Sequence, residues 1–142
     1  MTYALPIERM RTSAPRIKSA TGTATGGVKI LLRAEGLALL AAATAAYAHW
    51  GFSWLLFAAL FLAPDLSFLA YFLGPRTGAA AYNLVHSTIV PIALGGLGLA
   101  LGAPLAVAIA LIALAHIGFD RALGYGLKYS AGFNDTHLSG RN

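Results

Sequence analysis

The chain contains no cysteine, so it forms neither disulfide bonds nor thiolate metal sites, and any bound metal would need histidine and carboxylate ligands. Charge is also scarce: Asp, Glu, Lys and Arg make up 11% of the 142 residues, against about 25% in a soluble globular domain. Because 58% of the residues are hydrophobic, the polar side chains are too few to coat a soluble globule. These shortages predict an integral membrane protein with a single domain.

Three further absences narrow the function. No internal repeat is evident, which argues against a transporter built from inverted repeats. The first apolar run is longer and later than the short hydrophobic segment of a secretory signal peptide. The ten Lys and Arg residues outnumber the five Asp and Glu residues, but they gather near the ends of the chain and form no continuous basic face, so we expect no nucleic-acid partner.

The chain contains long apolar runs, and these predict an all-α fold. We expect a polytopic membrane protein with four transmembrane helices in an antiparallel bundle, since about 20 apolar residues cross a bilayer. Pro64 is expected to kink the second helix. Residues 1–29 are expected to form a disordered basic arm, and residues 124–142 a polar tail rich in glycine and aromatic residues. The predicted helices are 30–49, 52–73, 79–101 and 104–123.

The distribution of Lys and Arg predicts the orientation. These residues lie in the arm, near the start of the first helix, in the 74–78 turn and in the tail, whereas the loops near Trp50 and Gly102 have none. By the positive-inside rule, both termini are expected in the cytoplasm. The basic arm is expected to bind the anionic headgroups of the lipid bilayer.

Five ionisable residues interrupt the apolar helices. An Asp at mid-membrane costs about 2.5–3.5 kcal/mol on insertion scales, so such residues indicate a functional site by default. At about 1.5 Å of rise per residue, all five are expected about 5–12 Å from the cytoplasmic ends of their helices. Groups from four helices at one depth can pair or share an ion. The five are Glu35, Asp65, His86, His116 and Asp120.

Two functional interpretations follow from this layer. In the first, the catalytic candidates Asp65, His86, His116 and Asp120 bind a divalent ion such as zinc, iron or manganese, with Glu35 as a further metal ligand, or act as an acid and base pair. A metal-activated water or a histidine general base would then attack an ester or amide near the headgroups. In the second, the polar layer fixes helix packing in a non-catalytic accessory subunit, in a homo-oligomer or a membrane complex.

Two smaller questions stay open from the sequence. Glu35 lies two residues from Arg33 and is equally explained as an ion-paired residue at the membrane surface. In the tail, Asp135 and His137 are expected in solvent, with folding of the tail back over the site as the alternative.

Three segments resemble a known family: LLRAEG from Leu31, FLAPDLSFLAYFLGPRTGAAAYNLVHS from Phe61, and AHIGFDRALGYGLKYSAGFNDTHL from Ala115. They are similar to domain of unknown function 4260, a family of small bacterial integral membrane proteins, over residues 30–138. The resemblance implies four helices in the bacterial inner membrane and no assigned activity, and the five ionisable residues all fall within it.

A looser similarity concerns chemistry. Tyr82-x-x-x-His86 and His116-x-x-x-Asp120 resemble the paired motifs of intramembrane prenyl-peptide-type proteases. The chain lacks the double glutamate of those enzymes, and only Glu35 could replace it.

Overall fold

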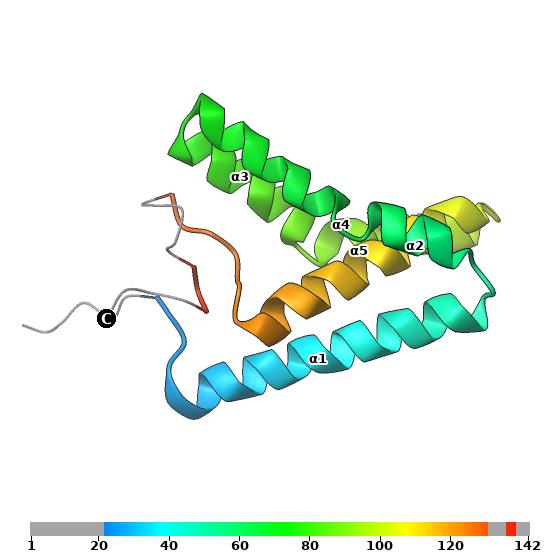
Figure 1. Cartoon of the computed structure of the whole chain (residues 1–142), viewed down its shortest axis with the longest axis horizontal. Coiled ribbons are helices and arrows are strands. Elements are labelled where there is room, and N and C mark those ends of the chain that lie inside the picture. The colour runs from blue at the N-terminus through cyan, green and yellow to red at the C-terminus, as the bar shows by residue number, and fades with distance from the viewer. Residues whose placement is uncertain (1–21, 131–135, 139–142) are drawn as a thin grey trace, which may run out of the picture.

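The computed structural model describes residues 22–130 and 136–138, and these residues are mainly helical (Figure 1). Among them, the only β-type pairing is an isolated antiparallel bridge between Lys128 and Thr136. The elements in chain order are α1 (Gly26–His49), α2 (Trp54–Leu60), the 3₁₀ helix η1 (Ala63–Leu73), α3 (Pro75–His86), α4 (Ile89–Ala100) and α5 (Pro104–Leu123).

These elements form four segments that are long and apolar enough to cross a membrane: Gly26–His49, Trp54–Leu73, Pro75–Ala100 and Pro104–Leu123. The all-α, four-span prediction is therefore confirmed. Two helix starts differ from the prediction by four residues, and the other boundaries agree within two. The first helix begins at Gly26, inside the expected arm, and the third begins at Pro75, because proline is well suited to the first turn of a helix. Residues 1–21 of the predicted arm lie outside the described residues.

The second and third spans are both interrupted. In the second, α2 ends at Leu60 and η1 begins at Ala63, next to Pro64, where a kink was expected. In the third, Ser87 adopts an extended backbone between α3 and α4. Pro91 explains this break, because it has no N–H to donate to the carbonyl of Ser87 and its ring would clash with that carbonyl. This second interruption was not among the predicted features.

Helix α5 is the centre of the packing, with α1 along one face and α4 along another. Gly118 allows the close crossing with α1, because a Cβ atom there would lie 2.5 Å from the Leu40 nitrogen and 2.7 Å from the Gly36 oxygen. At about 100° per residue, Gly118 points away from His116 and Asp120. The glycine therefore lets α1 support the back of the helix that carries these two residues.

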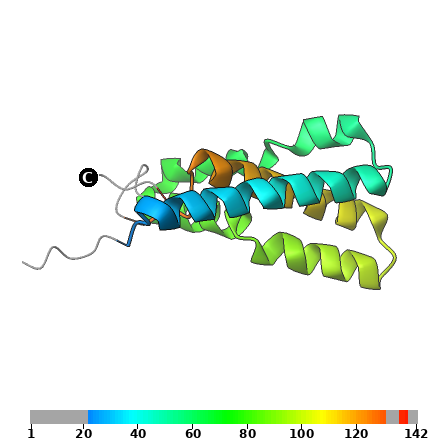
Figure 2. The ribbon, with the colours of Figure 1, turned by 90° about the horizontal axis from the view of Figure 1, so that it is seen from below.

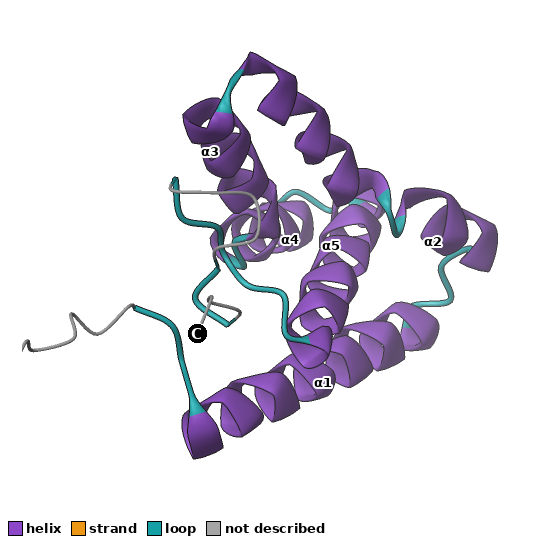
Figure 3. Cartoon of the chain, turned by 60° about the vertical axis from the view of Figure 1, so that its left-hand side comes forward, coloured by secondary structure: helices purple, strands orange, loops and turns teal. Residues whose placement is uncertain are grey.

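The hairpin of η1 and α3 packs on itself and diverges from α1 and α5 toward the end of the molecule where Gly26 and Leu123 lie (Figures 1 and 3). Viewed from below, α2 and α4 lie on opposite sides of α1 (Figure 2). The described part of the tail crosses the fork between the hairpin and α5 (Figure 3). Asp65 and His86 lie on the hairpin side of this fork, and His116 and Asp120 lie on the α5 side.

The tail is held in the fork by backbone and side-chain hydrogen bonds. The Asn83 side chain accepts from the Lys128 nitrogen at 2.7 Å and donates to the Lys128 oxygen at 2.8 Å. The Leu127 nitrogen donates to Nδ1 of His137 at 2.9 Å. The prediction that His137 is solvated is wrong, since the tail folds back against the bundle, whereas Asp135 lies outside the described residues.

Candidate metal centre

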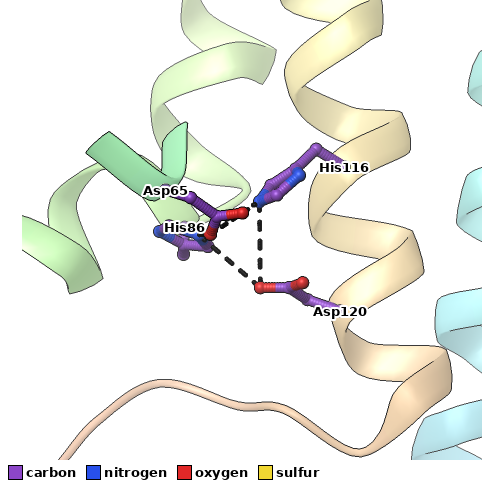
Figure 4. A group of neighbouring side chains, drawn as sticks. All are labelled: Asp65, His86, His116 and Asp120. Atoms are coloured by element: carbon purple, nitrogen blue, oxygen red, sulfur yellow. Dashed lines mark hydrogen bonds and ion pairs between the residues drawn. The ribbon is translucent and has the colours of Figure 1, made fainter. Parts of the chain in front are cut away.

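Three elements bring together four of the predicted site residues (Figure 4). Asp65 lies in the first turn of η1, immediately after the break in the second span. His86 is the last residue of α3, immediately before the break in the third span. His116 and Asp120 lie one turn apart on α5 and share one face of it. Both breaks therefore deliver a side chain to α5.

The reactive atoms of these side chains converge. The Nε2 atoms of His86 and His116 are 3.2 Å apart. Oδ1 of Asp65 lies 3.4 Å from Nε2 of His86 and 3.5 Å from Nε2 of His116. Oδ2 of Asp120 lies 3.5 Å and 3.8 Å from the same two nitrogens. All four ligand atoms lie within 4.8 Å of one another.

Burial is uneven across the cluster. The side chains of His86 and His116 are 3% and 1% exposed, whereas those of Asp120 and Asp65 are 15% and 35% exposed. The imidazoles therefore form the closed side of the cluster, and Asp65 marks the side from which a small molecule or ion can approach.

Neighbouring groups orient His86 and Asp120. The carbonyl oxygen of Tyr82 lies 3.0 Å from Nδ1 of His86, and a carbonyl only accepts, so Nδ1 carries the proton. This leaves the lone pair of Nε2 directed at the cluster. The Tyr82 ring stacks on the imidazole with centroids 3.7 Å apart, and its hydroxyl donates to Oδ2 of Asp120 at 3.0 Å. Tyr82 thus fixes one ligand by its backbone and another by its side chain.

His116 is held differently. Its ring meets the ring of Phe61 edge to face at 5.5 Å, and its buried Nδ1 has no hydrogen-bond partner among the described residues. Metal-ligating histidines usually donate this second nitrogen to a carbonyl or carboxylate, which orients the ring. Here the contact with Phe61 restricts the orientation of the ring, and Nδ1 makes no hydrogen bond to a described residue.

The tail adds a cation next to the cluster. Nζ of Lys128 lies 4.8 Å from the ring centre of Tyr82 and 5.1 Å from that of Phe68, and the residue is 8% exposed. Burial lowers the pKa of the Lys128 ammonium group, and the negative charges of Asp120 and Asp65 oppose that shift. Lys128 was not among the predicted site residues, and its only signal in the sequence is its place in the same family-like segment as His116.

Glu35 is not part of the cluster. It lies on an exposed position of α1, next to Gly36, which packs against α5. The structure therefore brings Asp65, His86, His116 and Asp120 together and leaves Glu35 apart.

The donor set suits a divalent metal ion. Four ligands at about 2.0–2.2 Å from a tetrahedral zinc are about 3.3–3.6 Å apart. The five separations that involve an imidazole nitrogen, 3.2–3.8 Å, lie close to that range. Neutral imidazoles and carboxylates are also ligands of iron and manganese. The separation between the two carboxylate oxygens is the widest, within 4.8 Å, so the carboxylates would have to approach each other around such an ion.

These features define an all-α membrane protein with four helical spans and a histidine and aspartate cluster within them. The model of the domain of unknown function DUF4260 matches residues 29–140, so the chain belongs to that family. No curated protein and no solved structure matches the chain.

Proposed function

We propose that the cluster binds one divalent metal ion, with zinc as the best fit, and that the protein is a metal-dependent hydrolase of the membrane. The convergence of two imidazole nitrogens and two carboxylate oxygens on one point is the observation that carries the proposal. Ionisable groups at membrane depth are costly, and a divalent ion bound among them would compensate that cost.

The residues would divide the chemistry between them. A divalent ion held here would act as a Lewis acid on an ester or amide carbonyl. His86 has its Nδ1 proton fixed by the Tyr82 carbonyl, which keeps the imidazole in one tautomer and one orientation. To leave the ion a position open to substrate, His86, His116 and Asp120 would be its permanent ligands. Asp65, the most exposed member of the cluster, would then accept a proton from an entering water.

We further propose that the protein lies in a bacterial inner membrane with both termini in the cytoplasm. The distribution of Lys and Arg over the loops supports this orientation. The cluster would then open toward the inner leaflet, near the depth of its headgroups. The basic arm would bind anionic headgroups on the same side.

Elemental analysis of protein purified without chelators tests the metal. We expect about one equivalent of zinc, iron or manganese per chain, as in other sites with this number of ligands. His86→Ala should lose the metal, whereas His49→Ala, which changes an exposed histidine at the far end of α1, should keep it. Wild-type protein without stoichiometric metal would refute the proposal.

A competing interpretation is that the cluster only joins the helices. The hydrogen bond from Tyr82 to Asp120, between α3 and α5, favours it. In that case Asp65→Asn and His86→Ala should each lower stability by about 1–3 kcal/mol, because a buried polar partner is left unpaired. In a functional site, the same substitutions should abolish metal binding or activity with stability kept or increased. Thermal unfolding in detergent, combined with metal content, separates the two.

A further inference from the structure

A groove of about 410 Å³ lies directly beside the cluster. Its walls come from the end of α2, the start of η1, the break between α3 and α4, and the middle of α5. Every lining residue is apolar: Leu60, Ala63, Pro64, Val85, Val90, Pro91, Leu94, Ile109, Ile112 and Ala113. At about 30 Å³ for a group the size of a water molecule, the groove has room for on the order of a dozen methylene groups.

The groove and the cluster share three elements. Pro64 precedes Asp65, Val85 precedes His86, and Ala113 lies three residues before His116 on α5, whereas α4 contributes to the groove alone. Along these elements the groove residues lie toward the middle of the spans, and Lys128 follows the end of α5 on the other side of the cluster. A ligand in the groove therefore has the cluster near the end that lies closer to the ends of the spans.

The charge around the cluster selects the polar end of a ligand. A divalent ion would neutralise Asp65 and Asp120, and the ammonium group of Lys128, over the Tyr82 ring, is a further positive charge beside them. An anionic head is complementary to that charge. Within a membrane, the molecules that combine an alkyl chain with an anionic head are lipids.

We infer that the groove binds the alkyl chain of an anionic lipid whose oxyanion head reaches the His/Asp cluster, next to Lys128. This inference rests on the proposed function and names its substrate class: a single-chain lipid with a phosphate or carboxylate head. Its chain points to the middle of the membrane and its head to the surface, which is the orientation of lipids in the adjoining leaflet.

Photolabelling tests this inference in the full-length protein reconstituted in vesicles. The probe is lysophosphatidic acid with a diazirine in its acyl chain, and dodecyl phosphate is the competitor. We expect saturable labelling that maps to α4 and α5 near Leu94 and Ala113 and is displaced by dodecyl phosphate, but not by glycerol phosphate, which has the head without the chain.

Substitutions assign the two ends of the ligand. Ala113→Leu and Leu94→Phe, which fill the groove from α5 and α4, should each weaken binding about tenfold, equivalent to about 1.4 kcal/mol. Ala42→Leu, at an exposed position of α1, should leave binding unchanged. Lys128→Gln should weaken labelling by the anionic probe and leave labelling by a neutral monoacylglycerol probe unaffected.

The outcomes distinguish this inference from the proposed function. Labelling that is uniform over the lipid-facing helices and insensitive to Ala113→Leu would overturn the lipid site, even if metal is bound stoichiometrically. Saturable labelling by the anionic probe that is lost in Ala113→Leu and weakened in Lys128→Gln, in protein that binds no metal, would support the lipid site through the groove and Lys128 and refute the metal-dependent function.

Discussion

Replacing Tyr82 with Phe removes one hydroxyl and tests whether the cluster is organised to bind metal. The Tyr82 hydroxyl donates to Oδ2 of Asp120 at 3.0 Å, and that oxygen is also one of the converging ligand atoms. Loss of such an outer contact typically lowers metal affinity by 10- to 100-fold, or about 1.4–2.7 kcal/mol. The aromatic ring remains, so its stacking on His86, with centroids 3.7 Å apart, is retained.

Tyr47→Phe is the matched control. Tyr47 is fully buried and its hydroxyl donates to the Ser53 oxygen at 2.7 Å, at the opposite end of the bundle from the tail. Both substitutions remove one hydrogen bond, for which a stability loss of about 1 kcal/mol is expected. Zinc affinity is measured by competition with a chromophoric chelator. Equal zinc affinities in Tyr82→Phe and wild type would show that the Tyr82 hydroxyl does not support a metal ligand.

Three other predictions concern packing, pH and topology. Gly118→Ala should destabilise the protein by about 1–3 kcal/mol, because the new Cβ would lie 2.5 Å from a backbone nitrogen of α1. Gly96→Ala is the control, since its Cβ would meet nothing within 4 Å and should not lower stability. Thermal unfolding compares the two variants. The pKa of His137 is lowered mainly by burial, so the undocked tail binds more protons and docking should weaken as pH falls through about 6.5. The protection factor of the Leu127 amide, which donates to the His137 ring, should therefore fall in hydrogen exchange corrected for the intrinsic rate at each pH. A cysteine introduced at Ala103 should react with an impermeant thiol reagent added outside the cell, and one at Asp135 should not; the opposite pattern would reverse the proposed orientation.

The spans and four members of the cluster were predictable because each depends on local features of the chain. Apolar length predicts a span, and the common depth of Asp65, His86, His116 and Asp120 predicts that they meet. Depth alone does not give the direction in which a side chain points around its helix. Glu35 has the expected depth but lies on an exposed position of α1, so depth was insufficient for that residue.

The tail and the second helix break were harder to predict. Lys128 is buried because Asn83 pairs with both its backbone groups, at 2.7 and 2.8 Å. The two residues are 45 positions apart, and neither has a periodic pattern that indicates the contact. The break at Ser87 could have been inferred from Pro91, four residues later, but the apolar run is continuous across it and favours one long helix.

The two helix breaks argue that the cluster is more than a contact between helices. A membrane-spanning helix that stops leaves backbone polar groups without partners, each costing several kcal/mol in lipid unless protein or water satisfies it. Helix pairs can be joined by polar side chains on continuous helices, without this cost. Here η1 begins two residues before Asp65 and α3 ends at His86, and the same breaks line the groove through Pro64 and Val85. Interrupted helices that meet within a membrane are typical of ligand sites, which is why binding is the interpretation we favour.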